Sequence, residues 1–160
     1  MDWTSQLEVI VSTAAAMLLG GLIGLERELK NRPAGFRTHM LVAAAASLLI
    51  GIGQLALLDE RMLKPPGWLT ADPLRLVEAV VAGVAFIGAG TIFAHRGPQQ
   101  VAGITTAASL LMVAVIGTAT GFRYYVLAFS ATALTLLVLT GLNAIERWLR
   151  SRRPPAHDDQ

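Results

Sequence analysis

Long apolar stretches alternate with short clusters of charge along the chain. Uncharged stretches cover residues 9–25, 40–58, 79–94, 97–122 and 124–145. Their lengths are close to the ~20 residues that cross ~30 Å of hydrocarbon as a helix. A soluble helix carries a polar face, and these stretches carry none. The pattern predicts an all-α, polytopic membrane protein with about five transmembrane helices. The expected spans are residues 6–26, 38–58, 74–94, 101–120 and 123–145.

Turn signals separate these spans, and one of them is a helix start. Asp72 precedes Pro73, which is typical of an N-cap followed by the first helical residue. Three residues apart in the same helix, Arg75 and Glu78 can form an ion pair on the outer side of the membrane. We expect residues 1–146 to form one transmembrane domain, and residues 147–160 to form a basic, disordered cytoplasmic tail.

The basic residues predict the orientation of the helices. Of the 13 Lys and Arg residues, nine fall on the side of the first and third loops and the C-terminus, and four on the other side. Because basic loops stay inside, we expect the N-terminus outside and the C-terminus in the cytoplasm. The composition, 54% hydrophobic and 15% charged, excludes an ordinary soluble domain. Basic residues at span ends indicate contact with anionic headgroups rather than with nucleic acid, and the lack of cysteine excludes thiol chemistry.

One cluster of charge needs more than an orientation signal. Glu26 and Arg27 close the first span, and Arg37 and His39 open the second. A carboxylate at that depth needs a partner, and Arg37 or His39 is the expected one. Arg27 continues the face of Gly20 and Gly24, where another helix can approach closely; snorkelling of Arg27 to the headgroups is the alternative. The cluster either fixes the first hairpin or forms a functional site.

Small residues suggest where helices meet. The third span is rich in Gly and Ala around Gly83, so we expect it to lie centrally among its neighbours. Gly88 to Gly90 either unwinds the helix or allows tight packing. Two glycine pairs, Gly20 with Gly24 and Gly117 with Gly121, predict a homodimer.

The motifs together resemble the membrane domain of the MgtC/SapB family. They read GLIGLERE, PAGFRTHMLV, DPLR, GVAFIGAGTI and GITTAASL in that order, and the resemblance covers roughly residues 10–142. It implies a bacterial inner-membrane protein linked to growth under magnesium limitation and, in some pathogens, to virulence. Many members continue into a soluble cytoplasmic domain, for which residues 147–160 are too few. The resemblance implies no resident cofactor, although magnesium is possible, and it suggests the F-type ATP synthase as a partner.

We expect one polar network at the cytoplasmic face. Its members are Glu26, Arg27, Arg37, Thr38, His39, Thr105 and Thr106, with the Gly88–Gly90 segment closing the site. Buried charges are tolerated only when they are hydrogen-bonded together, although threonines at such positions often bond only to their own helix. Glu26 and His39 are weak candidates for metal ligands.

Three functions remain open from the sequence. The first is a regulator that binds another integral membrane protein, and the second is an oligomeric transporter or channel for a small cation such as magnesium. The third is an intramembrane enzyme, which is disfavoured because the sequence shows no catalytic motif. Liposome assays with a magnesium-sensitive dye distinguish the first two.

Overall fold

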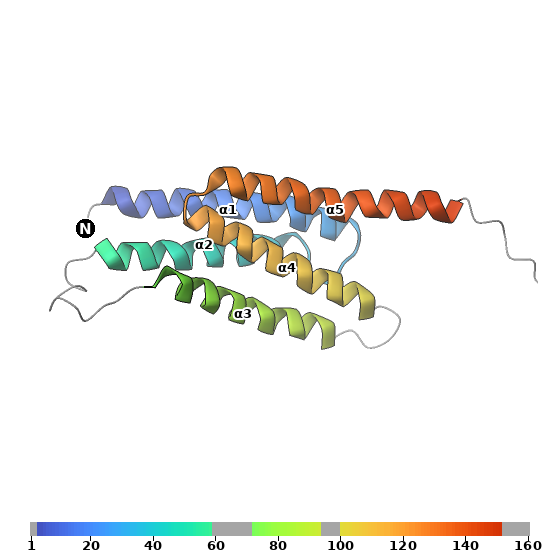
Figure 1. Cartoon of the computed structure of the whole chain (residues 1–160), viewed down its shortest axis with the longest axis horizontal. Helices are drawn as coiled ribbons and strands as arrows, with labels where there is room; N and C mark the ends of the chain where they lie inside the picture. The colour runs from blue at the N-terminus through green and yellow to red at the C-terminus, as the bar shows by residue number, and fades with distance from the viewer. Residues whose placement is uncertain (1–2, 59–71, 94–99, 152–160) are drawn as a thin grey trace, which may run out of the picture.

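Five helices make up the structure, a computed structural model that describes residues 3–58, 72–93 and 100–151, and their side chains except those of residues 100–102 and 142–151 (Figure 1). The helices are α1 (Trp3–Leu29), α2 (Phe36–Leu58), α3 (Pro73–Phe93), α4 (Gln100–Gly121) and α5 (Tyr125–Ser151). Four of them are long and apolar enough to cross a membrane, and the apolar part of α5, Tyr125–Gly141, is shorter. The expected all-α, polytopic architecture is confirmed.

The central helix of the bundle is α4. It packs against all four other helices, whereas α3 packs only against α4 and α2 in the described part of the chain. Of the apolar segment of α4, 61% is buried, against 17% for α3. The expectation that α3 lies centrally is therefore wrong. Small side chains permit close packing on any side, but they do not decide whether protein or lipid covers them.

Two glycine pairs join helices of the same chain. A Cβ on Gly20 would lie 2.7 Å from the His39 carbonyl oxygen, and a Cβ on Gly24 would lie 2.8 Å from Cα of Phe36. On α4, a Cβ on Gly117 would overlap the Ala43 carbonyl, and one on Gly121 would lie 2.8 Å from the Ser47 carbonyl oxygen. The surfaces that we assigned to a homodimer are thus interfaces of α2 with α1 and α4 within one subunit. The dimer itself stays a prediction.

Two of the three glycines of α3 do not contact another helix. The helix continues without a break through Gly88 and Gly90, so the alternative of an unwound segment is wrong. The Thr91 hydroxyl donates to the Gly88 carbonyl at 2.8 Å, which helps to satisfy the last turn. Gly88 faces Ala107 of α4, but no atom lies within 4 Å of a Cβ placed on Gly83 or Gly90.

The ends of α1 and α4 use the same capping geometry. Asn31 has φ 49° and Arg123 has φ 65°, the left-handed conformation that follows many helices. Beyond α1, the Arg32 N–H donates to the Arg27 carbonyl at 3.0 Å, and beyond α4 the Tyr124 N–H donates to the Ala119 carbonyl at 2.8 Å. Both bonds satisfy carbonyls that the helix leaves open. Each chain reversal is therefore tight, and it holds the next helix against its predecessor.

Three expectations about helices α3 and α5 have mixed outcomes. The Asp72 carboxylate accepts from the Leu74 N–H at 2.9 Å, as an N-cap does. Within the described residues, however, Arg75 and Glu78 form no ion pair; both side chains are exposed, where such a pair gains little. The helix α5 continues to Ser151, so residues 147–151 of the expected tail are helical, and residues 152–160 lie outside the described part.

Candidate functional site

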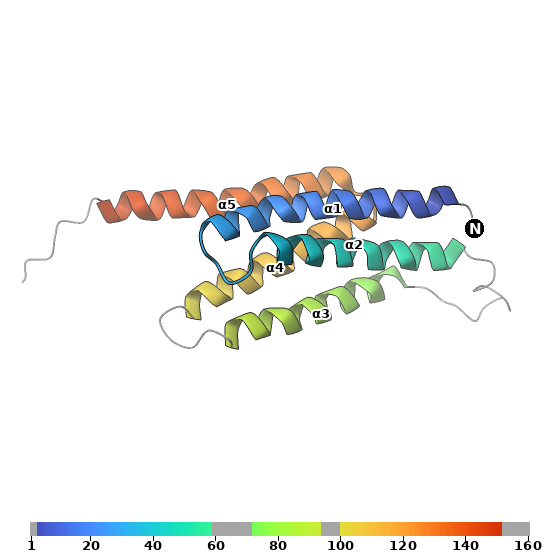
Figure 2. The same cartoon turned by 180° about the vertical axis from the view of Figure 1, so that it is seen from behind.

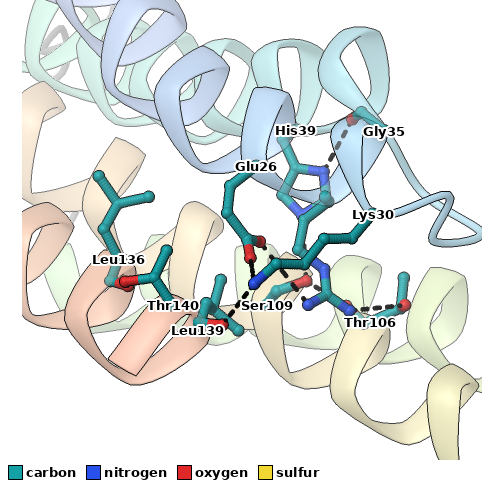
Figure 3. Close-up of polar contacts among 10 residues, drawn as sticks. Glu26, Lys30, Gly35, His39, Thr106, Ser109, Leu136, Leu139 and Thr140 are labelled. Carbon is teal, nitrogen blue, oxygen red and sulfur yellow. Dashed lines mark hydrogen bonds and ion pairs between the residues drawn. The ribbon is translucent and has the colours of Figure 1, made fainter. Parts of the chain in front are cut away.

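A group of buried charges lies where α1 ends against α4 and α5 (Figure 3). The Glu26 carboxylate forms an ion pair with Lys30, four residues later and just past the end of α1, and a second one with the Arg27 guanidinium at 3.8 Å. The Glu26 side chain is only 10% exposed. Burial of a carboxylate at that level is tolerated because two cations surround it.

Arg27 reaches across to the central helix. Its side chain is 2% exposed, and Nη2 donates to the Thr106 hydroxyl of α4 at 3.4 Å. The bond is long, and Nε of Arg27 has no hydrogen-bond partner among the described residues. Arg27 therefore points into protein rather than snorkelling to the headgroups. Its Nε–H is a buried donor without a partner among the described residues.

His39 forms the second half of the site from the first turn of α2. It is completely buried. Nδ1 contacts the Gly35 carbonyl oxygen at 2.9 Å, and Nε2 contacts the Ser109 hydroxyl at 3.0 Å (Figure 3). Because a carbonyl only accepts, Nδ1 carries a proton. The Ser109 hydroxyl also contacts the Thr106 carbonyl at 2.8 Å, so its single proton goes either there or to His39. The two arrangements differ by one proton on the imidazole.

The contact between His39 and Ser109 is also the contact of a nucleophile with a general base. Ser109 is 3% exposed and His39 is fully buried. Neither residue lines the apolar groove between α2 and α3. A catalytic pair needs a position beside it for the reacting atom. Both partners are buried, and their contact joins α2 to α4.

Two further contacts attach the site to its surroundings. The Lys30 ammonium donates to the Leu139 carbonyl of α5 at 2.9 Å. Because Lys30 also pairs with Glu26 of α1, its side chain connects α1 to α5. The Glu28 carboxylate accepts from the Phe36 N–H at 2.8 Å. Glu28 thus caps the first turn of α2, where backbone donors are open. That contact gives Glu28 a structural role.

Several expected members of the network lie elsewhere. Arg37 and Thr38 line a groove between α2 and α3, and Thr105 lies on the exposed side of α4. The expected pairing of Glu26 with Arg37 is wrong: the described ion-pair partners of Glu26 are Lys30 and Arg27. The reason is helical rotation, because Arg37 and His39 are two residues apart and therefore point about 200° apart around the helix.

The charge balance of the buried group is positive. One carboxylate, Glu26, faces two cations, Arg27 and Lys30. No group of three or more His, Cys, Asp or Glu side chains with metal-binding geometry occurs in the described part of the chain. Glu26 and His39, the weak metal candidates, both contact protein groups, and their role as metal ligands stays a prediction.

Comparisons with known proteins decide the family. The model of the MgtC family matches residues 13–148. The chain belongs to the MgtC family. Relatives include "Putative magnesium transporter YhiD" of Escherichia coli K12, 36% identical over 82% of this chain and 59% of the relative. "Protein SapB" of Bacillus subtilis is 33% identical over 86% and 57%, and "Protein MgtC" of Brucella abortus 2308 is 34% identical over 92% and 55%. No solved structure matches.

Membership of the MgtC family fixes the setting of this chain. Together with the long apolar helices, it makes the protein a multi-pass protein of the bacterial inner membrane that belongs to a magnesium-related family. The chain spans less than three fifths of the length of the three relatives named above. The buried site lies within the matched residues, so it is part of the shared membrane domain.

Sequence reasoning missed two members of the site. Lys30 is one of the nine basic residues that predict the orientation, and it also lies four residues after Glu26, the spacing of a helical ion pair. Ser109 lies three residues after Thr106 and therefore on the same face of α4. Both signals were present in the spacing. The spacing does not show which helix packs against Lys30 or against Ser109.

Proposed function

We propose that this protein is a regulator of another integral membrane protein, linked to magnesium homeostasis or adaptation to low magnesium. One observation carries the proposal: the buried polar site holds two cations and one carboxylate. A divalent cation in transit needs several oxygen ligands and a negative surrounding. A site of net positive charge opposes its passage.

An unpaired hydrogen-bond donor in the site supports the same conclusion. Nε of Arg27 is a buried donor without a partner among the described residues. Such a donor favours an acceptor, for example a backbone carbonyl or a carboxylate, over a metal ion. The site therefore suits a structural role better than a cation pathway, and no enzyme activity is proposed.

The alternative function is an oligomeric transporter or channel for magnesium. The name of the Escherichia coli relative, which includes a magnesium transporter, favours it. Magnesium transport by this chain is only a proposal, because the chain covers 59% of that relative's length. In this alternative a homodimer would complete a pathway that one subunit is too small to enclose.

The partner in the regulatory function is a multi-pass membrane protein, for which the F-type ATP synthase is the family-based candidate. A homodimer is compatible with both functions. The contact surface must lie outside the buried interfaces of α2 with α1 and α4. Exposed apolar side chains are available on α3 and α5, including Phe86 and Val126.

Flux measurements test the proposal. Purified protein is reconstituted into liposomes that contain a magnesium-sensitive dye, with a magnesium ionophore as the positive control. We expect magnesium entry no faster than into protein-free liposomes. In parallel, a strain that lacks the gene should grow poorly at low magnesium and recover with the wild-type chain.

Glu26→Gln is the decisive variant. Magnesium entry that requires the wild-type protein and is lost in Glu26→Gln would establish the transporter and overturn the regulator. Lys30→Met is the matched control, because it removes a cation from the same site and should increase a genuine cation flux rather than abolish it.

A further inference from the structure

A long apolar groove separates α2 from α3. It has a volume of 530 Å³, within the ~300–1,000 Å³ typical of small-molecule sites. Its walls include Leu41 and Leu49 of α2 and Val80, Gly83 and Ile87 of α3. Figures 1 and 2 show from both sides that α3 diverges from α2 toward the end where α1 turns into α2.

The groove has the length of one leaflet. Its α2 wall extends from Arg37 to Leu49, which at ~1.5 Å per residue is about 18 Å. Half of a ~30 Å hydrocarbon core is about 15 Å. The groove therefore runs from the headgroup level of one leaflet to about the middle of the bilayer.

The two ends of the groove differ in charge. Arg37 and Thr38 lie at the end near the first loop, and the remaining lining is made of aliphatic side chains and Gly83. No hydrogen bond or ion pair joins the Arg37 guanidinium to another residue in the described part of the chain. An unpaired guanidinium at headgroup level attracts an anion, and phosphate matches its planar donors.

We propose that this groove binds one anionic phospholipid of the leaflet that the basic residues assign to the cytoplasm. Arg37 binds the headgroup phosphate, with the Thr38 hydroxyl beside it. An acyl chain lies along α2 and α3, over the gap that Gly83 leaves open. This site is distinct from the buried group around Glu26, and it does not depend on the regulatory function.

Charge complementarity selects the lipid among the possible occupants. A transmembrane helix, from a second copy or another protein, would place an apolar surface along the groove but would leave Arg37 without a partner. A phospholipid satisfies both ends at once. It also matches the length of a single leaflet, whereas a spanning helix is about twice as long.

Lipid titration of the delipidated, full-length protein tests the proposal. The probes are short-chain phosphatidylglycerol and short-chain phosphatidylcholine, and bound lipid is counted by native mass spectrometry. We expect one tightly bound phosphatidylglycerol, with about fivefold preference over phosphatidylcholine, the effect of one basic residue. Inorganic phosphate alone should neither bind at the same concentration nor displace the lipid.

Two variants with matched controls locate the site. Arg37→Gln should remove the preference for phosphatidylglycerol, whereas Arg75→Gln, on the opposite side, should keep it. Gly83→Leu fills the groove and should abolish binding of both lipids. Ala85→Leu, at an exposed position of the same helix about 200° around from Gly83, should bind as the wild type does.

Three results of the binding assays would overturn the inference. They are equal binding of the two lipids by the wild type, an unchanged preference in Arg37→Gln, and binding of phosphate alone. If Gly83→Leu fails to fold, Arg37→Gln decides, because Arg37 is exposed. A photoreactive residue at position 83 in native membranes adds a last arm: crosslinks to a protein helix instead of lipid would identify a helix-docking groove.

Discussion

The two sides of α2 use the same residue types to opposite effect. On the side that faces α1 and α4, glycine permits backbone contact, and arginine is buried. On the side that faces α3, a Cβ placed on Gly83 would meet no atom of another helix within 4 Å, and Arg37 is exposed in an apolar groove. Residue type alone therefore does not say whether a glycine marks an interface or an opening. The position of its neighbours does.

The largest difference between the two sides should come from the arginines. Arg27→Met leaves Glu26 with Lys30 alone and breaks the contact with Thr106, so we expect a loss of about 3 kcal/mol in the free energy of unfolding. Arg37→Met removes an exposed side chain and should change it by less than ~0.5 kcal/mol. Unfolding by sodium dodecyl sulfate in lipid-free mixed micelles measures both.

Arg27→Lys is the control for charge. It keeps the cation but loses the planar donors, so it should fall between the wild type and Arg27→Met. If Arg27→Met and Arg37→Met cost the same, the burial of Arg27 in the structure does not hold in the membrane, and the contrast between the two sides of α2 fails.

The sequence predicted the elements of this fold well and their arrangement less well. Expected spans 38–58 and 74–94 compare with α2 at Phe36–Leu58 and α3 at Pro73–Phe93. Helix bounds follow from local signals, namely the hydrocarbon length and the capping residues. The central position of α4 depends on contacts between distant segments, which periodicity alone does not contain.

The candidate site was predicted in part for the same reason. The sequence grouped Arg37 with His39 because they are close along the chain, but the helix separates them. His39 and Ala43 share the face that meets Gly20, whereas Arg37 and Leu41 share the groove. Spacing of four residues reveals both faces. It does not reveal which face packs against protein and which faces the groove, because both faces are mainly apolar.

A smaller difference should come from the glycines. A Cβ at Gly117 would overlap the Ala43 carbonyl, and backbone cannot move aside easily. Gly117→Ala should therefore cost about 1–3 kcal/mol of unfolding free energy through overpacking. Gly83→Ala meets no atom, and it should be neutral or stabilising by up to ~1 kcal/mol because alanine favours the helix.

The same detergent titration compares these glycine variants, with Gly90→Ala as a second open position. A destabilised Gly83→Ala would mean that an unseen surface covers α3, such as a second copy of the chain. The oligomeric state of that variant, measured in nanodiscs against the wild type, would then show whether α3 carries the expected homodimer.

The smallest expected effect separates adjacent residues of α2. His39 contacts Ser109 of α4, whereas Thr38 faces the groove. A double-mutant cycle of His39→Asn with Ser109→Ala should give a coupling free energy of about 1 kcal/mol, the net worth of one buried hydrogen bond. Thr38→Val with Ser109→Ala should add within ~0.5 kcal/mol, because the two side chains share no partner. Coupling of Thr38 to Ser109, or none between His39 and Ser109, would mean that α2 is rotated about its axis relative to α4, and the groove would then lose Arg37 as well.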